Sequence, residues 1–143
     1  FYHLAFAKKV VNTFEASQHH DLDRVIMFQG MEGYDDIRPG FTKVAEWTDG
    51  EFTDYGIETA EYGMDFEGED LHVDDIAGDS AAITEAVLAG ERDDQFADAI
   101  ALNAALRIYA REDVDSIEAG LDAARDAIAD GSVAAVLDEL RAF

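Results

Sequence analysis

A length of 143 residues suits one ordinary domain, and an apolar content of 48% is enough to build a core and argues against disorder. Thirty-three acidic residues face ten basic ones, so the formal net charge is −23, which argues against nucleic-acid binding because phosphate contacts need clustered Lys and Arg. The sequence has no cysteine, no apolar run near the roughly 20 residues of a membrane-spanning helix and no signal-peptide pattern, which excludes disulfides and thiol chemistry and favours a cytoplasmic location.

The first predicted elements are a helix and a buried strand. Residues 3–18 repeat apolar side chains every four positions from Phe6 to Phe14, which predicts an amphipathic helix. The next residues are polar and break this pattern. Residues 24–29 then carry the short apolar run Val-Ile-Met-Phe, which favours a buried strand. Residues 30–40 contain three glycines and the only proline of the sequence, so a loop is expected there.

A β-hairpin is predicted next. Residues 41–47 and 51–57 have the composition of strands, and Asp49-Gly50 between them is a strong turn signal because glycine tolerates the positive φ that such turns need. Antiparallel pairing of the two strands follows. Residues 58–79 are acidic and show little periodicity, so we expect a surface loop with at most short pieces of structure.

The remaining sequence predicts a helical tail. From Ser80 onward, apolar residues at helical spacing predict four helices, in residues 80–90, 96–106, 117–128 and 133–140. Asp115 and Glu118 have capping-box spacing before the third helix, and Gly131 is suited to end it. Helix, strand, loop, hairpin and helical tail together predict an α/β fold in which helices flank a mixed sheet.

The charge is spread along the whole chain instead of gathered in a tail, and only three of the ten basic residues are lysine: Lys8, Lys9 and Lys43. Repulsion over such a surface destabilises the compact state in dilute buffer, and salt screens it. The composition therefore favours a halophilic source over an acidic mesophilic protein. A helical pattern is already under way by Leu4, so we expect the chain to be part of something longer.

One segment has the residue types of a catalytic or metal site. From Phe28 to Ile37 a strand end is followed by a glycine-containing loop with the pair Asp35-Asp36. Ligands of open α/β sheets bind beyond the carboxyl ends of strands. Mg²⁺ takes one or two carboxylates and completes its shell with water and substrate phosphate, so Asp35 and Asp36 are candidate metal ligands. The alternative, in so acidic a chain, is a solvated surface pair.

The same segment resembles a motif of the anthranilate phosphoribosyltransferase family, glycosyltransferase family 3. The family's loop follows a strand and reads His-Gly-x-Asp-Gly-Leu-Asp-Glu, and residues 29–36 here read Gln-Gly-Met-Glu-Gly-Tyr-Asp-Asp. In the family, the acidic pair helps to hold magnesium for the pyrophosphate of phosphoribosyl pyrophosphate, and the resemblance assigns this role to Asp35 and Asp36. Arg38 follows the pair and could reach a substrate phosphate or form an ion pair with either aspartate.

Further segments resemble the family in the same order along the chain. Residues 42–50 are similar to its Thr-x-Val…Gly hairpin, and Gly78-Asp79 with the following helix are similar to its Gly-Gly-Asp…Leu-x-Gly stretch. Residues 102–105 resemble its Leu-Asn-Ala-Ala helix, and residues 118–131 resemble its closing Glu-Gly…Ala…Ser-Gly pattern. The resemblance implies that residues 1–143 are the C-terminal part of a nucleoside phosphorylase/phosphoribosyltransferase-like α/β domain.

The sequence also departs from the family's pattern. Gln29 stands where the family has His, Asp36 where it has Glu, and Ala77 where it has the first Gly of Gly-Gly-Asp. Arg38-Pro39 after the loop is similar to a paralogous branch, of which some members bind nucleic acid. The family's helical N-terminal domain, its Gly-Thr-Gly-Gly-Asp loop and its Lys-His-Gly-Asn-Arg segment lie upstream of the part represented here, so these residues alone are not expected to carry the full active site.

The resemblance implies a full-length enzyme that uses Mg²⁺ to transfer phosphoribosyl from phosphoribosyl pyrophosphate to anthranilate or a similar aromatic acceptor, in tryptophan biosynthesis. It also implies that the missing N-terminal part is needed and that full-length chains pair as a homodimer through its helices. Two alternatives stay open. One is a non-catalytic relative that binds a ligand or nucleic acid, and the other is an acidic helical scaffold.

Other polar and aromatic residues have simpler structural interpretations. His19 and His20 fall in a turn and are expected to be solvated. Asn103 is expected to satisfy a buried backbone group, and Trp47 to be a packing residue. Lys43 lies in a predicted strand and is expected to face solvent. The sequence has no Gly-x-Ser-x-Gly elbow and no Ser-His-Asp set, so a hydrolase triad has no support.

Overall fold

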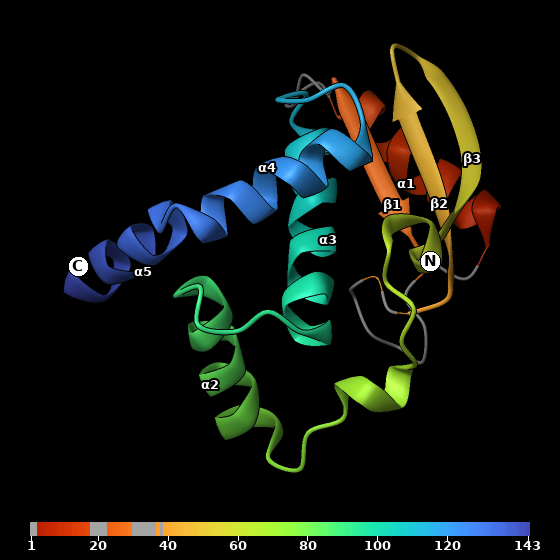
Figure 1. Cartoon of the computed structure of the whole chain (residues 1–143). Coiled ribbons are helices and arrows are strands. Elements are labelled where there is room, and N and C mark those ends of the chain that lie inside the picture. Colours follow the sequence, from red (N-terminus) through yellow and green to blue (C-terminus); the bar gives the residue numbers. More distant parts are fainter. Residues whose placement is uncertain (1–2, 18–22, 30–36, 38) are drawn as a thin grey trace. The chain divides into compact units, whose positions relative to one another are not determined.

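The computed structural model describes residues 3–17, 23–29, 37 and 39–143 and divides the chain into two compact units, Phe1–Asp65 and Phe66–Phe143. The first unit contains the sheet, and the second is helical (Figure 1). The elements are α1 (Leu4–Ala16), β1 (Arg24–Phe28), β2 (Phe41–Thr48), β3 (Glu51–Glu58), the 3₁₀ helices η2 (Thr59–Tyr62) and η3 (Gly68–Leu71), α2 (Ile76–Leu88), α3 (Gln95–Ala110), α4 (Ile117–Ala129) and α5 (Ser132–Ala142).

The sheet of the first unit has the strand order β1-β2-β3, with β2 in the middle. Both pairs are antiparallel, and Thr48 stands opposite Glu51 across the hairpin. Asp49 and Gly50 between them both have positive φ, 51° and 82°, which is why Asp-Gly suits this two-residue turn. The predicted hairpin is confirmed.

The predicted α/β class is confirmed: a three-stranded antiparallel sheet accompanies the helices. Among the residues described, all strand pairing is antiparallel, whereas a mixed sheet also needs a parallel pair. A parallel neighbour could be added only at the outer edge of β1 or of β3.

Helix α1 packs on one face of this sheet. Its residues Ala7 and Val11 are buried, and the helix contacts β2. The Nζ atom of Lys8 lies 5.0 Å from the centre of the Phe52 ring, on the face that also includes Trp47. Trp47 is buried, as expected of a packing residue.

A buried charged group lies on the opposite face and joins all three strands. Glu46 of β2 is 5% exposed. Its Oε1 lies 3.1 Å from Nε of Arg24 on β1, and its Oε2 accepts a hydrogen bond of 3.0 Å from the Tyr55 hydroxyl on β3. Because a buried carboxylate is costly without partners, these two contacts compensate for its loss of water.

Helices α3 and α4 form the core of the second unit. Leu102, Ala105 and Leu106 of α3 are buried, as are Leu121 and Ala124 of α4. A separate role belongs to the half-buried Asn103, whose Nδ2 donates to the Ala99 carbonyl at 2.9 Å. The expectation that Asn103 satisfies a backbone group is confirmed.

Gly120 allows the two helices to approach closely. A Cβ added at this position would lie 2.6 Å from the carbonyl oxygen of Ala105, and backbone atoms cannot move aside as a flexible side chain could. We expect Gly120→Ala to lower the free energy of unfolding by about 1–3 kcal/mol, as overpacking does. Urea unfolding of the full-length protein would measure this loss. Ala119→Gly is a matched control at a half-buried neighbour; equal losses in both variants would contradict the steric explanation.

Two helix starts differ from the sequence-based prediction. Helix α2 begins at Ile76, before the predicted Ser80, because Asp75 caps it by accepting a hydrogen bond of 3.2 Å from the Gly78 amide. Glycine had suggested a loop there. The cap of α4 is Ser116 instead of Asp115, and its hydroxyl oxygen accepts a hydrogen bond from the Ala119 amide.

Between residues 58 and 79, the short helices η2 and η3 confirm the prediction of short structured pieces.

Asp130 stabilises the start of α5 in a pH-dependent way. Its Oδ1 accepts a hydrogen bond of 2.8 Å from the Ser132 amide. This backbone hydrogen bond, and to a smaller extent one from the Ser132 side chain, lowers the pKa of Asp130 below the ordinary 3.8. Because the pKa of Asp130 is lower in the folded state than in the unfolded state, its contribution to stability is complete above the unfolded-state pKa. That contribution is lost as the pH falls through the folded-state pKa. Asp130→Ala should therefore lower the melting temperature at pH 6 and have little effect at about pH 2. An equal effect at both pH values, followed by circular dichroism, would contradict this assignment.

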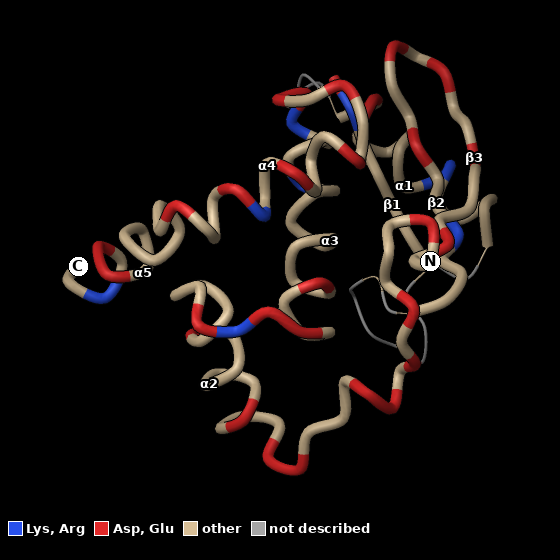
Figure 2. Tube along the Cα trace, in the orientation of Figure 1, with Lys and Arg blue, Asp and Glu red and all other residues tan. Residues whose placement is uncertain are grey.

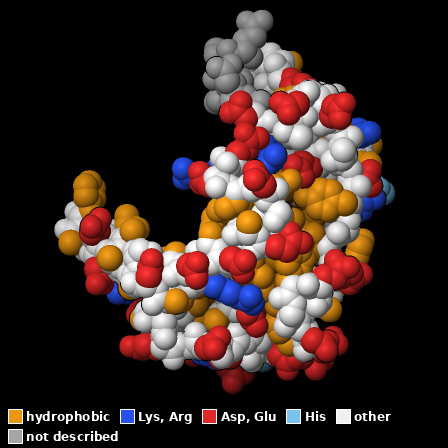
Figure 3. All heavy atoms as spheres, turned by 45° about the horizontal axis from the view of Figure 1, so that its top comes forward, with side chains coloured by type: hydrophobic (Ala, Val, Ile, Leu, Met, Phe, Trp, Pro, Cys, Tyr) orange, Lys and Arg blue, Asp and Glu red, His pale blue; other side chains and the backbone are white. Residues whose placement is uncertain are grey.

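Acidic side chains are dispersed over both units. Figure 2 shows Asp and Glu on helices, strands and loops alike, with Lys and Arg far fewer, and acidic groups are scattered over the face drawn in Figure 3. Several of the arginines pair with an acid, as Arg125 does with Asp98 at 2.8 Å. Since ten bases cannot neutralise thirty-three acids, most of the repulsion must be screened by solvent ions.

Candidate functional site

The candidate metal loop leaves the sheet at the carboxyl end of β1. Phe28 is the last residue of the strand, and the Gln29 amide continues the ladder by donating to the Lys43 carbonyl at 2.9 Å. The predicted site residues Asp35, Asp36 and Arg38 lie outside the residues that the structure describes. The structure therefore places the start and end of this loop, and the roles of these three residues stay predictions.

The end of the loop is anchored in the first unit. Ile37, directly after Asp36, is only 2% exposed, and Pro39 is also buried. Gly40 follows with a φ of +90°, and its amide donates to the Thr59 hydroxyl at 2.9 Å, while the Thr59 amide donates back to the Gly40 carbonyl at 3.2 Å. The two aspartates are thus directly followed by a fixed, buried position.

Sequence reasoning gave no role to Thr42, which lies beside these anchors on β2. Its side chain is 1% exposed, and its hydroxyl oxygen has no hydrogen-bond partner within the described part of the chain. A buried hydroxyl without a partner is unfavourable and is uncommon. The only signal in the sequence was its place in the Thr-x-Val segment that resembles the family.

The ligand types at the loop suit magnesium. Two adjacent carboxylates supply hard oxygen ligands and leave positions for water and phosphate oxygens, which is how Mg²⁺ is usually held. Elsewhere, over the described ranges, no three His, Asp or Glu side chains come together in a way that could hold a metal ion. The pair Asp35 and Asp36 therefore remains the candidate site for a divalent ion.

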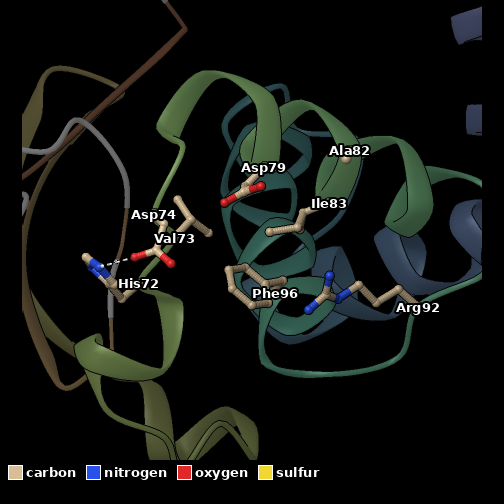
Figure 4. Close-up of a pocket in the computed structure, with 8 residues that line it drawn as sticks. All are labelled: His72, Val73, Asp74, Asp79, Ala82, Ile83, Arg92 and Phe96. Atoms are coloured by element: carbon tan, nitrogen blue, oxygen red, sulfur yellow. Dashed lines mark ion pairs between the residues drawn. The ribbon is translucent and has the colours of Figure 1, made fainter.

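A separate hollow of about 460 Å³ lies within the second unit, between the segment before α2, the first turns of α2 and the start of α3 (Figure 4). It is lined by His72, Val73, Asp74, Asp79, Ala82, Ile83, Arg92 and Phe96. Its size would admit a small molecule, but it is an open hollow, and half of the residues that line it are exposed.

The charged groups of this hollow already have partners within the unit. Arg92 pairs with Asp94, and its guanidinium lies 4.6 Å from the centre of the Phe96 ring. Asp79 accepts a hydrogen bond of 3.0 Å from the Asp75 amide and so helps to start α2. These contacts explain the Gly78-Asp79 segment as a helix start and do not require a ligand.

The sequence profile described as "Glycosyl transferase family, a/b domain" matches residues 3–134. The anthranilate phosphoribosyltransferase of Aromatoleum aromaticum is 34% identical over 125 residues, which are 85% of this chain and 35% of that protein. The anthranilate phosphoribosyltransferase of Shewanella amazonensis is 35% identical over 105 residues, or 70% of this chain and 29% of that protein. The sequence similarity therefore extends over most of this chain.

Two solved structures match the fold of this chain over about 80% of its length. The crystal structure of anthranilate phosphoribosyltransferase from Thermus thermophilus has a TM-score of 0.69 and 29% identity, and covers 81% of this chain and 34% of that one. The Saccharomyces cerevisiae enzyme in complex with 4-fluoroanthranilate has the same TM-score at 19% identity, covers 80% of this chain and 34% of that one, and supports the fold alone.

The chain spans about a third of the length of these relatives. In the ranges described, none of the helices is both long and apolar enough to cross a bilayer. The matching profile, the identities above 30% and the shared fold lead to one conclusion: this chain belongs to the glycosyl transferase family, whose α/β-domain profile matches residues 3–134.

Proposed function

We propose that this chain is the C-terminal α/β part of a phosphoribosyltransferase that transfers phosphoribosyl from phosphoribosyl pyrophosphate to anthranilate or a similar aromatic acceptor, as in tryptophan biosynthesis. The observation that carries this proposal is the run from Gln29 to Asp36, which begins directly after β1 and ends at the buried Ile37. The relatives called anthranilate phosphoribosyltransferase, at 31–35% identity, support it.

The proposed mechanism assigns binding and positioning to residues of this chain. Asp35 and Asp36 would hold Mg²⁺, which neutralises charge on the departing pyrophosphate when bound. Arg38 would bind a phosphate oxygen of the same substrate through its guanidinium. Ile37 and Pro39, the described neighbours on each side of Arg38, are both buried.

The rest of the proposed enzyme would come from its N-terminal part. It would supply the phosphate-binding loop, because the resemblance places the family's Gly-Thr-Gly-Gly-Asp loop, whose backbone amides would cradle the pyrophosphate, upstream of this chain. We also propose that full-length chains form a homodimer through their N-terminal helices and act in the cytoplasm.

An assay of the full-length protein tests the activity. With phosphoribosyl pyrophosphate, anthranilate and Mg²⁺, we expect anthranilate to be consumed and pyrophosphate to be released in equal amounts. Chelation by EDTA should stop the reaction, and added Mg²⁺ should restore it. If the protein binds phosphoribosyl pyrophosphate in calorimetry but consumes no anthranilate, anthranilate is the wrong acceptor. If the protein binds no phosphoribosyl pyrophosphate, the proposed function is wrong.

A second candidate is a non-catalytic relative, such as a member of the paralogous branch, that binds a ligand or nucleic acid. Gln29, Asp36 and Ala77, which replace residues of the family's motifs, favour it. Filter binding of single-stranded DNA over a range of salt concentrations separates the two. Affinity that falls steeply with salt would favour the second candidate. The net charge of −23 predicts no binding.

The dispersed acidic surface also supports a proposed adaptation to high salt, as in a haloarchaeal source. We expect the melting temperature of the full-length protein to rise between about 0.1 M and 2 M KCl, because the screening length falls from about 10 Å to below 3 Å. Differential scanning calorimetry would measure this change. A melting temperature that is constant or falls over this range would contradict the proposal.

A further inference from the structure

We propose that Thr59 is a positioning residue for the proposed magnesium site, because it fixes the backbone at Gly40, just beyond the loop that carries Asp35 and Asp36. Thr59 is the first residue of η2, directly after β3, and is 3% exposed. It lies in the first unit together with Gly40. This role rests on the proposed function and adds a residue that sequence reasoning missed.

The Thr59 hydroxyl takes the place of a backbone carbonyl where the ladder between β2 and β3 ends. The two strands lie side by side (Figure 1) and their register pairs Phe41 with Glu58, so Gly40 and Thr59 form the next pair. Residues of a hydrogen-bonded antiparallel pair exchange two backbone bonds. Here the Thr59 amide donates to the Gly40 carbonyl at 3.2 Å, but the Gly40 amide donates to the Thr59 hydroxyl at 2.9 Å. The Thr59 carbonyl accepts instead from the Met64 amide at 3.1 Å.

The bond from the Gly40 amide therefore depends on the type of side chain at position 59. A serine has the same acceptor as threonine, whereas a valine has the shape of threonine but no hydrogen-bonding group. Gly40 itself has a φ of +90°, a conformation that favours glycine. The hydroxyl and the positive φ together set the direction in which the chain enters β2 at Phe41.

Covalent geometry links this anchor to the acidic pair. Asp36 is bonded to Ile37, and the Cα atoms of neighbouring residues lie about 3.8 Å apart. Ile37 and Pro39 are buried, and the proline ring fixes one further backbone angle before Gly40. Groups outside the ligand shell orient metal ligands, and the loss of one typically costs about 10- to 100-fold in metal affinity or activity. Thr59 acts as such a group through Gly40.

Substitution of Thr59 in the full-length protein tests this role. The quantity to measure is the Mg²⁺ requirement, the Mg²⁺ concentration that gives half of the rise in phosphoribosyl pyrophosphate affinity in calorimetry. We expect Thr59→Val to increase it about 10-fold and Thr59→Ser to restore the wild-type value. Tyr55→Phe is a matched control because it also removes one hydrogen bond, of 3.0 Å, from the same sheet. It should lower the melting temperature about as much as Thr59→Val and leave the Mg²⁺ requirement unchanged.

A pair of glycine variants decides the question if Thr59→Val does not fold. Gly40 and Gly50 have φ of 90° and 82°, and within the described part of the chain an added Cβ would meet nothing within 4 Å at either position. Alanine is strained at both positions because of the positive φ, so the two variants should lose similar melting temperature. Only Gly40→Ala should increase the Mg²⁺ requirement, again about 10-fold.

The outcomes separate this role from the proposed function. If the wild type depends on Mg²⁺ but Thr59→Val has the same Mg²⁺ requirement, the role of Thr59 is overturned and the proposed function stands. The role is also overturned if Thr59→Ser behaves like Thr59→Val, if Tyr55→Phe raises the requirement equally, or if Gly40→Ala and Gly50→Ala have equal requirements. If Mg²⁺ has no effect on the affinity of the wild type, the proposed magnesium site is wrong, and the role of Thr59 with it.

Discussion

Replacement of both Asp35 and Asp36 by Ala should lower the phosphoribosyl transfer rate of the full-length protein at least about 100-fold, the usual size of the loss when a transition-state charge is no longer stabilised. The physical reason is that, within the ranges that the structure describes, no cluster of carboxylates or histidines could hold the metal in their place. Steady-state kinetics with phosphoribosyl pyrophosphate as the varied substrate would measure the loss, because metal that bridges enzyme and diphosphate affects both binding and the chemical step.

A matched control removes the same amount of charge elsewhere. Asp23 and Glu51 are both exposed and lie in the same unit, at the other end of the sheet. The variant Asp23→Ala/Glu51→Ala should keep wild-type kinetics and have a slightly higher stability at low salt, since it relieves repulsion. Full activity in the Asp35→Ala/Asp36→Ala variant would remove these two residues from the mechanism.

The largest expected effect on stability is at Glu46. Glu46→Ala should lower the free energy of unfolding by about 3 kcal/mol, because it leaves the charge of Arg24 largely buried without its carboxylate. The Arg24 and Glu46 side chains are 15% and 7% exposed, so water screens the pair little. Tyr55→Phe should lose only about 1 kcal/mol, the value of one hydrogen bond. Urea unfolding of the full-length variants would measure both.

A double substitution distinguishes the loss of the carboxylate beside Arg24 from the loss of packing. Arg24→Met with Glu46→Leu removes both charges and keeps apolar volume, so it should recover most of the stability that Glu46→Ala loses. If the double variant were as unstable as Glu46→Ala, the Glu46 carboxylate would stabilise the strands by more than compensation of the Arg24 charge. If Glu46→Ala itself were as stable as the wild type, the buried pair would have no role in the fold.

The sequence predicted local features of the fold well because they depend on neighbouring residues. The Asp49-Gly50 turn follows from two positive φ values, and Gly90 and Gly131 end helices with φ of 70° and 79° for the same reason. The start of α2 was missed because Gly78 suggested a loop, whereas the preceding Asp75 supplies a cap. Contacts between distant residues, such as Glu46 with Arg24, were not predicted, since periodicity does not report them.

For the candidate site, the sequence predicted the position of the loop after a strand but not how it is held. β1 ends at Phe28, one residue before the predicted end at Gln29. The anchoring of Gly40 by Thr59 depends on two segments 19 residues apart, and the burial of Ile37 depends on tertiary packing. Neither follows from spacing. The Thr42 hydroxyl, which has no hydrogen-bond partner among the described residues, is likewise visible only once the sheet is formed.

The most direct test is the dependence of phosphoribosyl pyrophosphate affinity on Mg²⁺, measured by calorimetry with the full-length wild type and the Asp35→Ala/Asp36→Ala variant. If the two carboxylates grip an ion on the diphosphate, affinity should rise with Mg²⁺ in the wild type by about 10-fold or more and change far less in the variant. The same rise with Mg²⁺ in both proteins would show that the ion is held elsewhere and would contradict the account.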